Sequence, residues 1–139
     1  MSHQINLESF SGPLDLLLFF IKRDEIDIMD IPISKITSDY LNAIKDLEQI
    51  NLSNAGDFIY MASSLMRIKA KMLLPLTNDN NEEEFDDPRI DLANKLIEYQ
   101  KFKNISNDLK KMYTQQLNFF PFNFNYIQKE KDYNNFNLE

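Results

Sequence analysis

The feature that most constrains the fold is an apolar run near the N-terminus, in the stretch 10-FSGPLDLLLFFIK-22. The triplet Ser11-Gly12-Pro13 is typical of a helix start, with the serine as a capping candidate and the proline near the first helical position. We therefore predict a helix over residues 13–23. Apolar residues occupy a stripe at the helical spacing i, i+3, i+4 and i+7 and fill the other faces as well. A helix with so little polar surface must be covered on more than one side.

Length and composition indicate one small helical domain with tails. The chain has 139 residues, enough for a modest core, and it has only two glycines. Leucine, lysine, glutamate and methionine occur in periodic segments, whereas β-branched residues are mostly isolated, so the predicted class is all-α. The chain has no cysteine, so neither a disulfide nor a thiolate metal site is expected, which fits the cytoplasm.

Charge and hydropathy argue against two classes of partner. The 15 lysines and arginines face 22 aspartates and glutamates, and the net charge of −7 opposes the phosphate backbone, so we expect no direct binding of nucleic acid. The longest apolar run, over residues 16–21, is far shorter than the roughly 20 residues that cross a bilayer. We expect no membrane span and no signal peptide.

Periodicity and helix breakers predict a small bundle of about four helices with a long third helix. The helices are expected over residues 13–23, 33–49, 54–75 and 88–114, with an extended connector over 26–33. Residues 77–88 carry six acids and no base, which is typical of a solvated linker. Residues 119–139 are rich in asparagine and phenylalanine, and we expect an extended or disordered aromatic tail.

Residues for catalysis or metal binding are nearly missing from the sequence. The only histidine, His3, lies in the N-terminal tail, and there is no glycine-rich phosphate loop. The acids of residues 24–30 lack the glycine turn of a calcium loop, so a solvated connector is the expected role. We predict a protein that is not an enzyme, with no cofactor, no metal and no small-molecule substrate.

The third predicted helix carries two apolar stripes. The first has a strict 3-4-3-4 spacing and the second lies beside it: Phe58, Met61, Leu65, Ile68 and Met72, then Ile59, Ala62, Met66 and Leu73. One stripe is enough to pack the helix onto its own domain, so the second is either more core or a docking face for another helix. Basic Arg67, Lys69 and Lys71 beside the methionines favour docking, while ordinary solvent-facing lysines are the alternative.

Aromatic residues are concentrated in the C-terminal part, where ten of the 17 lie at or after Tyr99. Little core remains there to receive the phenylalanines of the tail, so a partner groove or an added strand would accommodate them. The other possibilities are that these residues fold back onto the bundle or continue into further chain.

Four ordered stretches resemble the bacterial segregation and condensation protein A family, the kleisin subunit of the prokaryotic SMC complex. They are FSGPLDLLLFFIK, IDIMDIPISKITSDYL, FIYMASSLMRIKAKMLLP and DPRIDLANKLIEYQKFK, and the match covers roughly residues 5–112. The resemblance implies roles in chromosome partition and condensation, the cell cycle and cell division. It also implies a cytoplasmic protein that associates with the nucleoid through SMC.

The same resemblance implies two protein partners. Residues 1–76 would form the N-terminal kleisin domain, whose third helix packs against the SMC coiled-coil neck, with these contact residues: Phe58, Met61, Ala62, Leu65, Met66, Ile68, Lys69 and Met72. Residues 77–88 would be the acidic linker, and residues 89–139 would be embraced by a dimer of segregation and condensation protein B (ScpB). The implied ScpB contacts are Leu96, Tyr99, Phe102, Leu109, Phe119, Phe120, Phe122 and Phe124.

The resemblance stops before the C-terminal winged helix that family members normally carry, since nothing after Tyr126 matches it. We expect a fragment or a shortened kleisin. The competing interpretation is a stand-alone helical interaction or homodimerisation module unrelated to chromosomes, in which both stripes of the third helix serve self-association.

Overall fold

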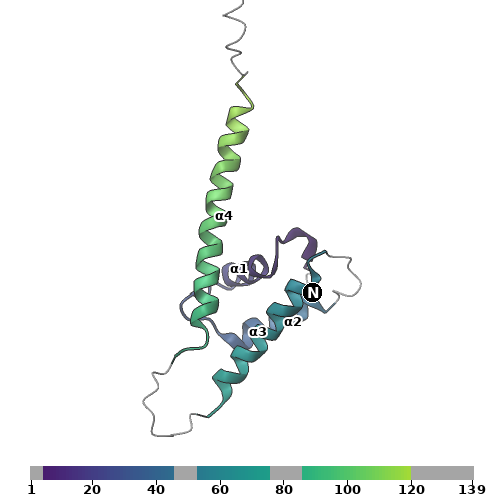
Figure 1. Ribbon diagram of the computed structural model, residues 1–139, viewed down its shortest axis with the longest axis vertical. Coiled ribbons are helices and arrows are strands. Elements are labelled where there is room, and N and C mark those ends of the chain that lie inside the picture. The colour runs from purple at the N-terminus through teal and green to yellow at the C-terminus, as the bar shows by residue number, and fades with distance from the viewer. Residues whose placement is uncertain (1–4, 46–52, 76–85, 120–139) are drawn as a thin grey trace, which may run out of the picture. The chain divides into compact units, whose positions relative to one another are not determined.

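The protein is described by a computed structural model that covers residues 5–45, 53–75 and 86–119 (Figure 1). The described residues contain one short 3-10 helix, η1 (Leu7–Ser9), and four α-helices. The α-helices are α1 (Pro13–Arg23), α2 (Ile33–Ile44), α3 (Ala55–Leu73) and α4 (Ile90–Gln116). No strand occurs in these ranges, and the predicted all-α class is confirmed.

The predicted helix lengths were correct for α1 and wrong for the third helix. α1 has the predicted bounds, whereas the longest helix is α4, with 27 residues, and α3 has 19. Pro75 closes α3 as predicted, because Leu74 precedes it and takes an extended conformation, as residues before proline prefer. α4 has no glycine or proline along its whole length, so nothing local stops it.

The connector between α1 and α2 was predicted to be extended, and this is wrong. It contains a turn in which the Asp30 N–H donates to the Asp27 carbonyl (3.0 Å) and the Met29 N–H donates to Asp27 Oδ1 (2.9 Å). An aspartate whose side chain accepts from the backbone two residues ahead stabilises such a turn. Three further predictions concern the end of the second helix, most of the acidic linker and the tail after Phe119; they lie outside the described residues.

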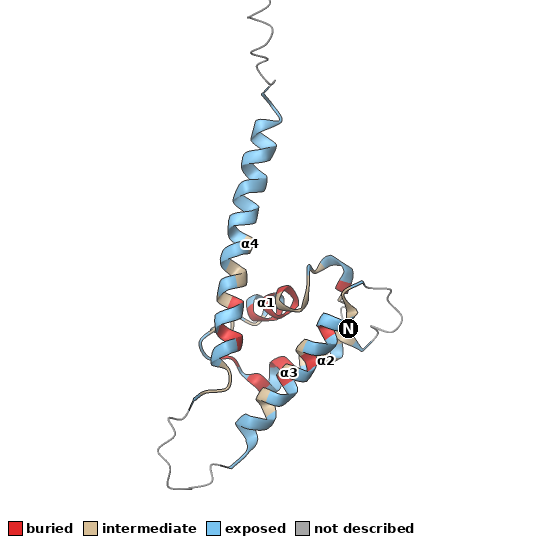
Figure 2. Ribbon diagram, viewed as in Figure 1, coloured by how far each residue is buried: buried red, intermediate tan, exposed pale blue. Residues whose placement is uncertain are grey.

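Contacts divide the chain into two compact units, Met1–Lys103 and Asn104–Glu139, and α4 contributes to both. The domain limits proposed at residues 76 and 88 remain predictions. In the first unit, α1, α2, α3 and the beginning of α4 share one hydrophobic core. Figure 2 shows the buried residues on these elements.

The apolar helix α1 is covered on several sides, as its sequence predicted. Its buried residues lie all around the helix and include an aspartate: Asp15, Leu16, Leu17, Leu18, Phe20 and Ile21. Only Phe19 of the apolar run is exposed, and its ring packs against that of Phe10. Each fully buried leucine or phenylalanine stabilises the fold by about 1.5–3 kcal/mol. The lack of a polar face on α1 is therefore a consequence of its central place in this core.

The start of α1 is stabilised by an aspartate and not by the predicted serine cap. Gly12 is the N-cap residue and makes no side-chain cap, while the Ser11 N–H donates to Asp15 Oδ2 at 3.1 Å. Asp15 is only 6% exposed, and its other oxygen accepts a hydrogen bond from Lys103 Nζ of α4. A buried carboxylate is costly unless it has such partners. The ion pair between Asp15 and Lys103 also joins α1 to α4 within the first unit.

A second polar contact joins the beginning of α4 to the connector. Arg89 donates to the Ile31 carbonyl (2.8 Å) and to Asp30 Oδ1 (3.1 Å), and it also pairs with Asp87. The hydrogen bonds from Arg89 hold the pKa of the Asp87 carboxyl below its ordinary value. Together with the buried Leu92 and Leu96, these contacts place the first part of α4 in the core.

Tyr40 of α2 carries a buried hydroxyl that connects α2 to α3. The ring has no exposed surface, and its O–H donates to the Phe58 carbonyl at 2.8 Å. Burial raises the pKa of this hydroxyl above its ordinary value of 10.0, because the phenolate would be desolvated.

We expect alkaline pH to destabilise the protein through Tyr40. Below pH 10 the stabilisation of the folded state by the protonated Tyr40 hydroxyl is fully present. Above pH 10 Tyr40 ionises in the unfolded chain but keeps its proton in the folded chain, so the free energy of unfolding falls as the pH rises. The limiting slope is about 1.4 kcal/mol per pH unit. Tyr40→Phe should cost about 1 kcal/mol at pH 8 through the lost hydrogen bond, and this difference from the wild type should shrink or reverse by pH 11. Urea unfolding at both pH values measures it, and an unchanged difference would contradict the assignment.

Candidate functional site

Three faces of α3 have different environments, and one of them belongs to the core. Phe58, Ala62 and Leu65 are buried, and Met61 and Ile68 are half-buried against the same cluster. This face corresponds to most of the first predicted stripe. It holds α3 against α1 and α2, so the first stripe is needed for folding.

A second face of α3 is exposed and has the spacing of a coiled-coil contact. Large and small residues alternate along it at steps of three and four: Gly56, Ile59, Ser63, Met66, Ala70 and Leu73, all exposed. We call these six residues the α3 seam. A side-chain Cβ built at Gly56 meets no atom within 4 Å, so the surface there is open. Small residues at every second position let another helix approach closely, and the large ones supply the knobs between them.

The residues predicted to contact the SMC neck are distributed over more than one face. Met66 and Met72 are exposed, and Met61, Ile68 and Lys69 are half-buried. Phe58, Ala62 and Leu65 lie in the core instead of on the surface, so they leave the set of proposed contact residues. Sequence reasoning missed Gly56, Ser63 and Ala70, because small residues add little to an apolar pattern. The signal that identifies them is their exact seven-residue repeat.

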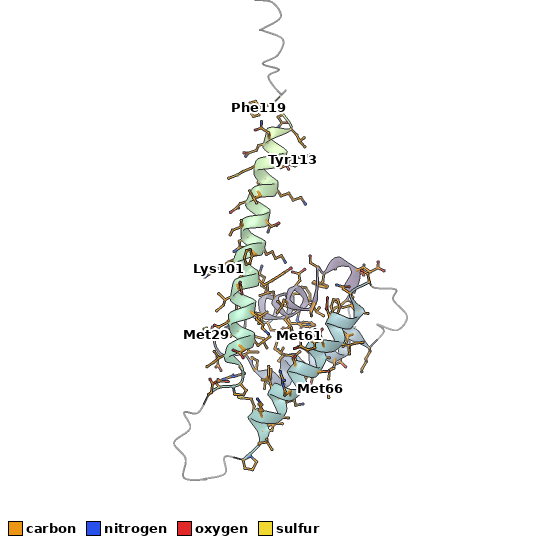
Figure 3. The ribbon with its side chains drawn as sticks, in the orientation of Figure 1. Met29, Met61, Met66, Lys101, Tyr113 and Phe119 are labelled. Atoms are coloured by element: carbon orange, nitrogen blue, oxygen red, sulfur yellow. The ribbon has the colours of Figure 1, made fainter. Side chains whose placement is uncertain are left out.

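The second unit presents another apolar stripe, on the later part of α4. Every described residue from Asn104 to Phe119 is exposed, and the stripe has steps of four and three: Ile105, Leu109 and Met112. We call these three residues the α4 seam. Figure 3 labels the neighbouring aromatics Tyr113 and Phe119, both exposed. Large apolar residues exposed to water over several turns of a helix are typical of a surface that another protein covers.

The residues predicted to contact ScpB likewise fall into a buried group and an exposed group. Leu96 is buried and Tyr99 packs against the core, whereas Phe102, Leu109 and Phe119 are exposed. Phe120, Phe122 and Phe124 lie outside the described residues. Ile105 and Met112 were not among the predicted contacts, although they have the same helical spacing as Leu109. The exposed set, which now includes these two, is the part of α4 available to a partner.

Other kinds of site find little support in the described part of the chain. No group of three His, Cys, Asp or Glu there is arranged to hold a metal ion, and no helix there is long and apolar enough to span a bilayer. What the described residues offer is two exposed helical stripes with coiled-coil spacing. Exposed apolar stripes of this kind are the surfaces through which helices bind other helices.

Comparison with known proteins identifies the family. The family model for segregation and condensation protein ScpA matches residues 20–133. Segregation and condensation protein A of Bacillus cereus (strain AH820) is 38% identical over 141 residues, which cover 96% of this chain and 57% of the relative. The Bacillus anthracis (strain A0248) protein of the same name has the same identity and coverage. The chain belongs to the segregation and condensation protein A family, and it spans little more than half the length of these curated relatives.

Proposed function

We propose that the chain is part of a non-enzymatic kleisin subunit that bridges SMC and ScpB in chromosome condensation and segregation during cell division. Family membership supports the general role, and the two exposed seams support a bridging mechanism. In this proposal the protein acts in the cytoplasm and reaches the nucleoid through SMC. It contacts neither nucleic acid nor membrane directly.

The observation that carries the proposal is the α3 seam. A coiled-coil neck presents apolar residues at steps of three and four, and the α3 seam has the same repeat in the same type of element. Lys69 flanks the seam and would meet acidic residues along the neck. The proposed neck contacts are the exposed large residues Ile59, Met66 and Leu73, together with the small residues between them.

The α4 seam is the proposed contact for the ScpB dimer. It lies in the second unit, and Phe119 continues the exposed apolar surface there. Phe120, Phe122 and Phe124 stay in the proposal as further contacts. Two seams on different helices would let one chain hold two partners at once, which is what a bridging subunit requires.

Sedimentation of the chain with each partner tests the proposal. We expect a complex with an SMC head-plus-neck fragment, a complex with the ScpB dimer, and a larger complex with both. A stable homodimer of the chain that is indifferent to both partners would overturn the proposal and support the homodimerisation module instead.

A pair of α4 variants separates the ScpB contact from general effects on charge. Leu109→Glu places a carboxylate in the α4 seam and should remove the ScpB complex, because an unpaired charge would be buried on binding. Asn107→Glu adds the same charge to the same helix outside the seam and should leave the ScpB complex intact. Both positions are exposed, so neither variant should change the stability of the chain.

A further inference from the structure

A groove with an apolar floor lies beside α3, on a face that contains none of the α3 seam. It has a volume of about 640 Å³ and runs between α3 and the segment Asp86–Lys95 that leads into α4. Its floor includes the half-buried Met61 and Ile68 and the buried Leu92. All of its lining residues belong to the first unit. The volume lies within the roughly 300–1,000 Å³ of typical binding clefts.

The two walls of the groove carry opposite charges that do not neutralise each other. Arg67 and Lys71 project from α3, and Asp86 and Asp91 lie on the opposite side; all four are exposed. Within the described residues no ion pair joins the two walls, although Asp87 pairs with Arg89. The acidic wall ends at Lys95, one turn into α4. The groove is therefore apolar at the bottom, basic on one side and acidic at the beginning of the other.

These features select one kind of occupant. The described residues contain no strand, so no sheet edge is available there for an added strand, and Tyr60 is the only aromatic lining residue, which does not suit a proline-rich ligand. A groove between two helical segments fits an amphipathic helix that anchors residues at i, i+3 or i+4, and i+7. Charge complementarity then requires acidic residues on one flank of that helix and basic residues on the other.

We propose that this groove is a docking site for an amphipathic helix with an acidic flank and a basic flank, supplied by a partner protein. The acidic flank pairs with Arg67 and Lys71, and the basic flank pairs with Asp86 and Asp91. The site is distinct from both seams, so the proposal goes beyond the bridging function. A second copy of this chain fits poorly, because the region 101-KFKNISNDLKK-111 of α4 carries four lysines and one aspartate and offers no continuous acidic flank.

The test uses the full chain and a set of labelled synthetic helical peptides. All peptides carry leucines at i, i+4, i+7 and i+11; one has glutamates on one flank and lysines on the other, and one has the same charges mixed on both flanks. We expect the segregated peptide to bind at least about tenfold more tightly in fluorescence anisotropy. A peptide with its two flanks exchanged would not serve as a control, because it could bind in the reverse direction and present each flank to the same wall as before. The mixed peptide has no direction in which its charges are segregated.

A charge-reversal variant assigns the binding to the groove. The double variant Arg67→Glu, Lys71→Glu makes both walls acidic. Its affinity for the segregated peptide should therefore fall by about tenfold or more, and its affinity for a peptide with lysine on both flanks should rise. Both residues are exposed, so circular dichroism should show an unchanged fold. Met66→Glu, which alters only the α3 seam, should leave peptide binding unchanged. Because this peptide assay contains neither SMC nor ScpB, its result does not depend on whether the proposed bridging function is correct.

Four outcomes would overturn the proposal. The first two are equal binding of the segregated and mixed peptides, and no binding of any peptide below millimolar concentration. The third is binding that occurs only after Glu82, Glu83 and Glu84 are replaced by glutamine, which would identify the chain's own acidic residues as the occupant. The fourth is a homodimer that the double variant dissociates, which would identify a second copy.

Discussion

Replacing Met66 by glutamate is expected to abolish binding of the SMC head-plus-neck fragment without unfolding the chain. Met66 is 55% exposed and lies in the middle of the α3 seam (Figure 3), so the glutamate is hydrated in the free chain and stability should change by less than about 0.5 kcal/mol. In the complex the carboxylate would be buried against apolar residues of the neck. The expected loss of affinity is on the order of 100-fold or more, measured by isothermal titration calorimetry.

The matched control for Met66→Glu is Tyr60→Glu. Tyr60 lies on the same helix and is similarly exposed, but it lines the groove and not the seam. It should keep its affinity for the neck fragment. If Met66→Glu binds the neck as well as the wild type does, the α3 seam is not the contact surface and the proposed function loses its main support.

The neighbouring substitution Leu65→Glu is expected to have the opposite effect, loss of the fold itself. Leu65 has no exposed surface and packs in the cluster that joins α1, α2 and α3. A buried unpaired carboxylate there should cost at least about 3–5 kcal/mol, which is comparable with the entire stability of a small domain. Circular dichroism should show reduced helicity and no cooperative unfolding transition.

A milder substitution at Leu65 leaves the chain folded, so the change in its free energy of unfolding can be measured. Leu65→Ala should lower the free energy of unfolding by about 2–5 kcal/mol, because it removes buried surface and leaves a cavity. Urea titration measures this change directly. A loss below about 0.5 kcal/mol, as for an exposed position, would show that Leu65 does not belong to the core. The pair Leu65 and Met66 thus distinguishes folding from binding with adjacent residues of one helix.

The local elements were largely predictable from the sequence because their signals are local. Pro13 marks the start of α1 and Pro75 lies just beyond the end of α3, and helical periodicity identified all four helices. The predictions that failed concerned which of two nearby side chains interacts with a helix start, and whether a short segment is extended or forms a turn. Asp15 and not Ser11 interacts with the start of α1, and Asp27 forms a turn where alternating residues suggested an extended segment.

The candidate site was only partly predictable, and the reason is visible on α3. Its two apolar stripes are equivalent by composition, so periodicity alone did not say whether Leu65 or Met66 faces the core. Gly56, Ser63 and Ala70 complete the α3 seam, but they carry no strong hydrophobic signal. The groove was not predictable at all, since its walls come from α3 and from a segment that begins more than ten residues later.

By itself, the sequence determined the helical class, the starts of α1 and α2, the starts of α3 and α4 to within two residues, the crowded apolar environment of α1 and the resemblance to the kleisin family. These properties follow from residue type and spacing, which act over one or two helical turns. Only the tertiary structure decided which face of α3 is buried, where α4 leaves the core and which charged residues share a groove. Those properties depend on which helices meet, because a side chain becomes core or surface only when another element covers it or leaves it in water.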